Sequence, residues 1–129
     1  MARIISADAA MAAAERAMLR PFAWGAADCC TAACAGFADL HGFDPMAHWH
    51  GYSTAREAAR NLGRDPVATI RTTLTRAGLV EGRAIGGIGL TQYRGRPSLL
   101  LCVGPDLWAG KTEHGLALLR ASIMDYRIA

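Results

Sequence analysis

Helical spacing of apolar positions dominates the first 78 residues of the chain. Residues 7–19 are rich in alanine and methionine, with Ser6 before them as an N-cap and Pro21 after them, where a helix must stop. The positions that we expect to face the core from this helix are Ile5, Ala9, Ala12, Ala13 and Met18.

A cluster of cysteines opens the second predicted helix. This helix should run from about Asp28, its N-cap, to Leu40, because Gly42 supplies the left-handed conformation that ends a helix. Cys29 then lies in the first turn, where free backbone N–H groups and the helix dipole favour a thiolate. The same N–H groups can stabilise an oxyanion during acyl transfer, so the sequence indicates Cys29 as a candidate nucleophile.

Two further helices are expected before residue 78. Thr54 and Glu57 have the spacing of a capping box, which predicts a helix through Leu62. Asp65 followed by proline predicts another helix that ends near Gly78.

Short apolar runs replace the helical spacing in the last third of the chain. Residues 98–104, SLLLCVG, predict one strand, and residues 107–119 and 124–129 predict two more, joined by turns. The glycine-rich residues 84–97 are expected to form a flexible or tight-turn connection, with no phosphate loop because no Lys-Ser/Thr follows. Helices followed by strands predict a single α+β domain over residues 1–129, with an antiparallel sheet of about three to five strands.

Composition and charge narrow the classes of function. The formal charge of +3 is small and the arginines are scattered, so neither nucleic acid nor an anionic membrane is expected as a partner. No apolar run reaches the roughly 18 residues of a membrane span, and Asp8, Glu15 and Arg16 interrupt any secretory signal. We therefore expect a protein made in a cytoplasm, without a cofactor, whose cysteines are reduced thiols.

The residues around Cys29 resemble a known family of enzymes. Trp24, Gly25, Asp28, Cys29 and Gly42 match the NlpC-like cysteine peptidases of the papain superfamily, in which an Asp-Cys pair opens a helix that closes on glycine. More closely, the stretches PFAWGAADC, WHGYSTAREAARNLG and AGKTEHGL resemble a short branch found in tailed phages, prophages and gene-transfer agents, encoded among tail-tip genes. The resemblance implies a papain-like fold and a virion protein of a tail tip, made in the bacterial cytoplasm, with other tail-tip or hub proteins as partners.

The resemblance also implies a catalytic histidine at the start of an early strand, and this chain departs from it there. Ser98 stands at the expected position, and the family's Gly-Asp has no clean counterpart in residues 84–97. A serine hydroxyl cannot act as a base near neutral pH. We therefore expect a structural or adaptor protein on a peptidase scaffold whose activity has been lost or reduced.

One alternative is an active cell-wall hydrolase that cleaves peptidoglycan peptides. Cys29 would attack the amide carbonyl, and a histidine from elsewhere in the fold, with His114 as the first choice, would protonate the leaving amine. Asp28 would then be both the helix cap and part of the Asp-Cys signature.

A second alternative is a zinc-binding module. If the HWH stretch is extended, His48 and His50 lie on one face and could bind zinc with Cys29, Cys30 or Cys34. Otherwise Cys30 and Cys34 are expected to pack in the core.

Four aromatic side chains are expected to pack against the Cys29 helix and fix its position, with the last of them on the sheet side: Phe22, Trp24, Phe37 and Trp108.

Overall fold

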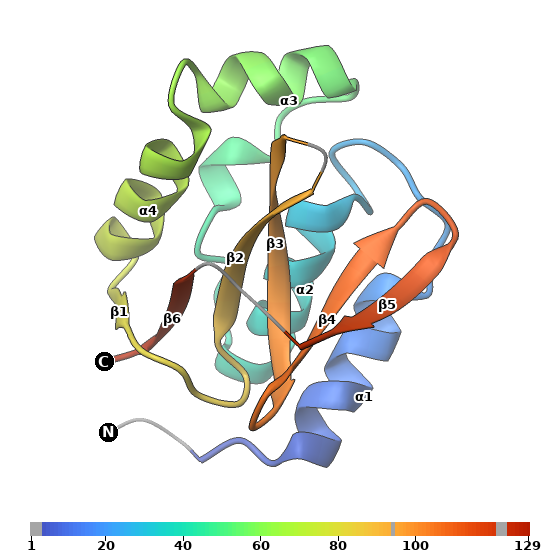
Figure 1. Ribbon diagram of the computed structural model, residues 1–129. Helices are drawn as coiled ribbons and strands as arrows, with labels where there is room; N and C mark the ends of the chain where they lie inside the picture. The colour runs from blue at the N-terminus through green and yellow to red at the C-terminus, as the bar shows by residue number, and fades with distance from the viewer. Residues whose placement is uncertain (1–3, 94, 121–123) are drawn as a thin grey trace.

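The computed structural model describes residues 4–93, 95–120 and 124–129 (Figure 1). Its helices are α1 (Ala7–Met18), α2 (Cys29–His41), the 3-10 helix η1 (Ala47–Trp49), α3 (Ala55–Leu62) and α4 (Pro66–Arg76). Its strands are β1 (Leu79–Glu81), β2 (Ile88–Tyr93), β3 (Arg96–Gly104), β4 (Leu107–Thr112), β5 (Gly115–Leu119) and β6 (Met124–Ile128). The fold is α+β, with four N-terminal helices packed on a six-stranded antiparallel sheet.

The helices begin where capping side chains stand in the sequence. The side chains of Ser6, Asp28, Thr54 and Asp65 each accept a hydrogen bond from a backbone N–H of the first turn that follows. Gly42 ends α2 with φ at 88°. The predicted starts of all four helices are confirmed.

Small residues bring α1 and α2 close together. The buried side chains of α1 are Ala10, Ala13, Ala14 and Met18, whereas Ala9, which was expected to be buried, is exposed. On α2, Gly36 lies so close to β3 that an added Cβ would come within 2.9 Å of Leu101 Cδ2. A glycine at this position therefore lets the helix lie directly on the sheet.

The sheet contains more strands than the sequence predicts. Its order is β1-β6-β2-β3-β4-β5, and the expected connection at residues 84–97 instead carries β2, which pairs with both β3 and β6. The prediction of a connection was wrong because Ile88 and Leu90, separated by Gly89, are fully buried at the centre of the sheet. Glycine lowers strand propensity, but burial between two partner strands outweighs that preference here.

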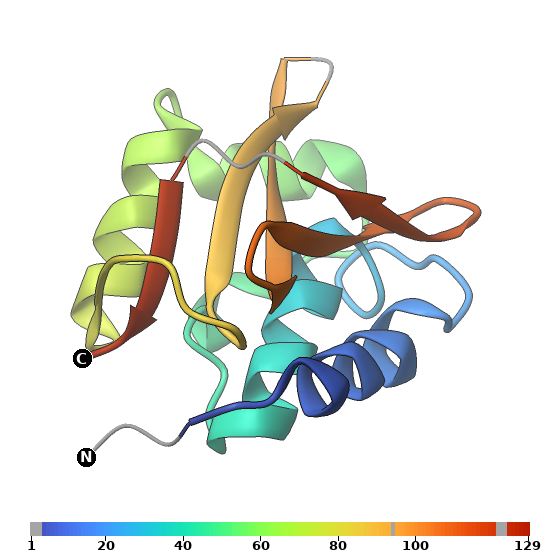
Figure 2. The same ribbon diagram turned by 60° about the horizontal axis from the view of Figure 1, so that its bottom comes forward.

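Helices α1 and α2 cover one face of the sheet, and α4 lies beside β1 (Figure 2). Leu99, Leu101 and Val103 of β3 belong to the core on the helical side. Trp108 packs instead with Leu100 and Cys102 in a separate cluster. The expectation that Trp108 seats the Cys29 helix was therefore wrong, because alternate residues of a strand point to opposite faces of the sheet.

Lys111 of β4 fixes the end of α1. Its side chain is only 5% exposed although it is the only lysine of the chain. Its Nζ donates to the backbone carbonyl of Met18 at 2.7 Å and to that of Arg20. A cation at a helix C-terminus satisfies carbonyl groups that the helix leaves unpaired, so Lys111 holds the chain entering the 21–28 loop against the sheet.

The helices in the described ranges are too short or too polar to cross a bilayer.

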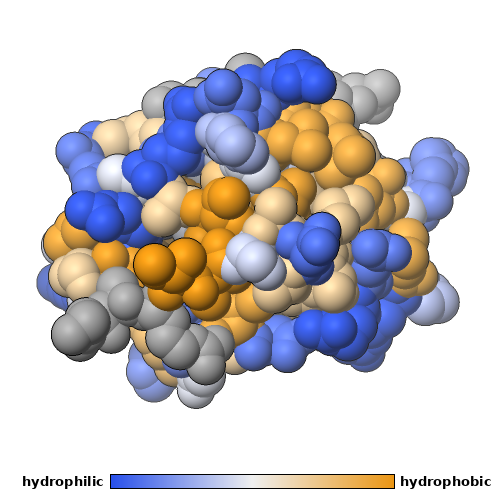
Figure 3. All heavy atoms as spheres, turned by 90° about the horizontal axis from the view of Figure 1, so that it is seen from below, coloured by the Kyte–Doolittle hydropathy of each residue, from blue (hydrophilic) through white to orange (hydrophobic). Residues whose placement is uncertain are grey.

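The face of the molecule seen from below, on the side where α1 begins, has apolar side chains in its middle and hydrophilic ones around them (Figure 3).

Candidate functional site

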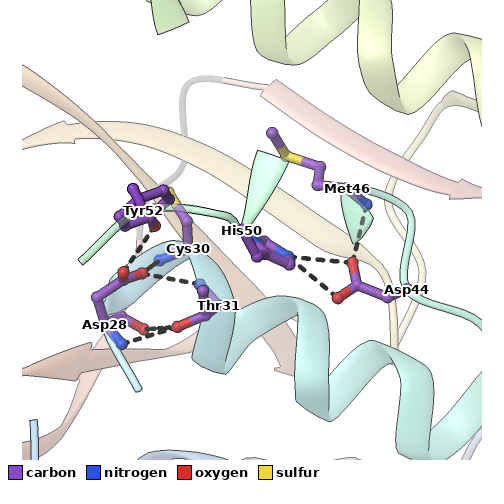
Figure 4. A network of polar contacts seen from close by, with 7 residues as sticks. All are labelled: Asp28, Cys30, Thr31, Asp44, Met46, His50 and Tyr52. Carbon is purple, nitrogen blue, oxygen red and sulfur yellow. Dashed lines mark hydrogen bonds and ion pairs between the residues drawn. The ribbon is translucent and has the colours of Figure 1, made fainter. Parts of the chain in front are cut away.

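Asp28 is the centre of the polar contacts at the head of α2 (Figure 4). Its side chain is nearly inaccessible, and Oδ1 accepts hydrogen bonds from the backbone N–H groups of Cys30 and Thr31, both at 2.9 Å. Oδ2 accepts from Gly25 N at 2.8 Å and from the Tyr52 hydroxyl at 2.6 Å. Burial, followed by this bond to Asp28, raises the pKa of Tyr52 well above its ordinary value. One carboxylate thus joins the 21–28 loop, the first turn of α2 and the loop that follows η1.

Gly25 has a physical reason to be glycine. Its φ is 81°, and a Cβ built on it would lie 1.7 Å from the carbonyl oxygen of Tyr52. Only a residue without a side chain lets the two loops approach so closely in this conformation. The sequence resemblance picks out Gly25, and the structure supplies the cause.

Cys29 is the first residue of α2 and is partly buried. Its Sγ lies 4.0 Å from Sγ of Cys30. The pKa of Cys29 is lowered to about 7, because hydrogen bonds from the Cys30 thiol, the Ser98 hydroxyl and the Leu99 backbone outweigh burial and the charge of Asp28. The pKa of Cys30 is raised well above its ordinary value, because its proton is held by Cys29 and the thiol is buried. The pair therefore favours a thiolate at Cys29 and a thiol at Cys30.

Ser98, the third residue of β3, is one of the groups that contact the Cys29 thiol. It pairs with Thr91 of β2, and the neighbouring Leu99 is fully buried against the helices. The sequence stretch SLLLCVG thus brings its first residue to the head of α2, although 68 positions separate Ser98 from Cys30 in the chain.

The histidines make their described contacts elsewhere. His41 lies 2.9 Å from the Gly86 carbonyl through Nε2, and His48 is exposed on η1. His114 is exposed at the turn between β4 and β5, where its backbone N donates to Thr112 Oγ1. Among the described hydrogen bonds, none joins an imidazole to Cys29 Sγ.

The HWH stretch does not have the extended shape that the zinc alternative required. Ala47–Trp49 form a 3-10 helix, so His48 and His50 do not share a face. His50 instead contacts Asp44, with Nε2 at 3.0 Å from Oδ2, and lies with Cys34. Burial would raise the pKa of Asp44, but hydrogen bonds from His50 and the Met46 backbone hold it below its ordinary value.

Sequence reasoning missed Asp44 and Tyr52. Asp44 followed by proline is a recognisable turn signal, and its Oδ1 accepts a hydrogen bond from Met46 N at 2.8 Å. Its pairing with His50, and the reach of Tyr52 to Asp28, depend on tertiary contacts that no local pattern encodes.

The aromatic side chains near the site are only partly in the core. Phe37 is fully buried, but Phe22 and Trp24 are half-buried and pack edge to face with ring centroids 5.0 Å apart.

Two surface hollows, of about 520 and 460 Å³, lie beside β1, β6 and α4, and Cys29 lines neither.

The Cys29 thiol should react as a thiolate at neutral pH. The rate of its alkylation by a haloacetamide, measured by mass spectrometry, should reach half its maximum near pH 7. Cys30→Ala and Ser98→Ala should each move this midpoint to higher pH, because each removes a donor to the thiolate. The buried Cys102, whose pKa burial raises, serves as the control in the same sample. A midpoint near 8.5, the ordinary value for a thiol, would contradict the described contacts.

Two comparisons with known proteins, one with curated proteins and one with solved structures, gave no match. A third, with models of protein families, matched residues 5–127 to a family described as a domain of unknown function, DUF6950. Since this match covers almost the whole chain, the protein belongs to the DUF6950 family.

Proposed function

We propose that this protein is a structural or adaptor component of the tail tip of a phage or phage-like particle. It would be built on an NlpC-like, papain-type scaffold whose peptidase activity has been lost or reduced. The observation that carries the proposal is the contact between Ser98 and the Cys29 thiol, at the place where the sequence resemblance implies a histidine.

The chemistry of acyl transfer explains why this contact matters. A cysteine peptidase needs a group that protonates the leaving amine and then activates water, and imidazole does both near neutral pH. The Ser98 hydroxyl can donate a hydrogen bond to the Cys29 thiolate, but it cannot exchange protons in this range. The site can therefore stabilise a thiolate without being able to complete a catalytic cycle.

The arrangement of elements supports the scaffold. A helix that begins at the cysteine packs on the central strand β3 of an antiparallel sheet, and β3 begins beside the thiol. This is the order of elements that the NlpC-like resemblance implies.

The surface supports a role in contact with other proteins. Apolar side chains gather on the face where α1 begins (Figure 3), and exposed apolar areas are commonly used for protein contacts. We propose other tail-tip or hub proteins as the partners, with the chain made in the bacterial cytoplasm and then incorporated in the virion tail.

The proposal is tested in the strain that produces the particles. Deletion of the gene should abolish infectious or transducing particles, and mass spectrometry should find the protein in purified tails. Cys29→Ala should restore the titre to that of the wild type, as should Cys102→Ala. If Cys29→Ala enters the tails but leaves the titre as low as the deletion does, the thiol is required and the proposal fails.

One observation favours a second candidate function, an active peptidoglycan peptidase that uses Cys29. The pKa of Cys29 is lowered to about 7 by donors from Cys30 and Ser98, so a nucleophilic thiolate is present at neutral pH. This candidate requires proton transfer from a group other than Ser98, and turnover of peptidoglycan fragments decides between the two.

A further inference from the structure

A second group of reactive side chains lies beside α2, away from its N-terminus. Cys34 is fully buried in the middle of α2, Asp44 lies in the loop that follows this helix, and His50 follows η1. The thiol sulfur, a carboxylate oxygen and a ring nitrogen of these residues all lie within 4.8 Å of one another. Three chain segments thus bring three different donor types to one place.

The contacts inside the group hold its members in position. His50 Nε2 lies 3.0 Å from Asp44 Oδ2 and 3.3 Å from Oδ1, and Met46 N donates to Oδ1 at 2.8 Å (Figure 4). The Cys34 thiol also interacts with the Asp44 carboxylate. The side chains of Asp44 and His50 are 28% and 16% exposed, so a small solute can still approach them.

His50 has one nitrogen that these contacts do not use. Its Nδ1 is buried and has no hydrogen-bond partner among the described residues. A buried polar atom without a partner is uncommon and calls for an explanation. If His50 binds an ion through Nε2, in place of the direct contact of this nitrogen with Asp44, both residues act as ligands and Nδ1 is left for the outer-shell bond that metal-binding histidines usually make.

We propose that Cys34, Asp44 and His50 bind a divalent cation of borderline softness, with Zn²⁺ as the representative ion. Thiolate sulfur, imidazole nitrogen and carboxylate oxygen are the three protein ligands that Zn²⁺ takes. Three ligands leave one tetrahedral position for water or for Cys30, which lies one helical turn before Cys34.

The ion would connect the middle of α2 to the loop that contacts the N-terminus of the same helix. Asp44 and His50 belong to the segment that ends in Tyr52, whose hydroxyl bonds to Asp28 and whose carbonyl lies against Gly25. This role is independent of whether Cys29 is catalytic, so the metal site and the proposed function can fail separately.

The test uses the full chain, reduced and freed of metal, and titrates it with Co²⁺ as a spectroscopic probe. One Co²⁺ per chain should bind and give the intense near-ultraviolet absorption of a sulfur-cobalt bond, and one equivalent of Zn²⁺ should remove it. His50→Gln and Asp44→Asn should each weaken binding by more than about 100-fold, because the loss of a direct ligand should cost more than the loss of an outer-shell partner.

Two control variants are matched to these changes. His48→Gln removes an exposed histidine of the same loop, and Asp39→Asn removes an exposed carboxylate of α2. Both should bind Co²⁺ as the wild type does. Because Cys34 is fully buried and its variants could fail to fold, the two ligands nearer to the surface carry the test, with circular dichroism as the check on folding.

Three outcomes would overturn the proposal. The first is the absence of stoichiometric binding by the wild type. The second is wild-type binding by folded His50→Gln and Asp44→Asn. The third is loss of the absorption in Cys29→Ala with full retention in those two variants, since this would place the ion at Asp28, Cys29 and Cys30.

Discussion

Gly25→Ala should lower the free energy of unfolding by about 3–5 kcal/mol, a loss at the upper end for single substitutions. The left-handed backbone of Gly25 accounts for about 1–2 kcal/mol of this, because L-residues with a Cβ are strained there. The rest comes from the collision of the new Cβ with the Tyr52 carbonyl oxygen, 1.7 Å away. One of the two loops must move, and with it the hydrogen bonds that Gly25 and Tyr52 make to Asp28. Urea denaturation followed by circular dichroism measures the loss.

Gly42→Ala separates the two contributions. Gly42 also has a positive φ, 88°, but a Cβ built on it meets nothing within 4 Å. This variant should therefore lose only the backbone part, about 1–2 kcal/mol. Equal losses in Gly25→Ala and Gly42→Ala would mean that the 21–28 loop yields freely, contrary to its tight contact with Tyr52.

Asp28→Ala should also cost about 3–5 kcal/mol. The substitution removes the acceptor of four hydrogen bonds in a site that is 1% exposed. Each buried donor left without a partner costs about 1–3 kcal/mol, although neighbouring losses are not additive and the loop can relax. The same variant should loosen the first turn of α2. The melting temperature should therefore fall, and the Cys30 thiol should be alkylated faster than in the wild type.

Asp65→Ala is the matched control for Asp28→Ala. Asp65 also caps a helix, but it is exposed and accepts one described backbone bond, from Ala68 N at 3.1 Å. Its loss should cost about 1 kcal/mol, the usual value for an N-cap. If the two substitutions cost the same, Asp28 acts only as a cap and does not join the loops.

The helix starts could be predicted because their causes are local. A capping side chain contacts a backbone N–H two or three positions away, so Ser6, Asp28, Thr54 and Asp65 act within one turn of the chain. The buried face of α1 could not be fixed in the same way. Its run of alanines offers several faces of similar hydrophobicity, and packing against α2 selects Ala10, Ala13 and Ala14.

The strands depend more on distant partners. Residues 84–97 carry four glycines, which locally favour a turn, yet β3 and β6 on either side make β2 a buried strand. Among the described strands, the short strand β1 pairs only with β6, and its three residues are too few to show a strand pattern.

The candidate site was partly visible in the sequence. Asp28 and Cys29 follow from capping and from the family resemblance, and Ser98 follows from the strand predicted over residues 98–104, which in the structure begins at Arg96. Tyr52 and Asp44 could not be found in this way, because their contacts with Asp28 and His50 span 24 and 6 positions through loops. The periodicity of a helix or a strand does not predict such contacts between loops.

We propose that Cys29 forms a stabilised thiolate without a working proton donor for catalysis. The most direct test is hydrolysis of purified peptidoglycan fragments by the reduced protein, followed by chromatography of the released peptides. The wild type should release no more product than Cys29→Ala over many hours at neutral pH. Release of several product molecules per wild-type chain, absent from Cys29→Ala, would contradict the claim and establish a peptidase.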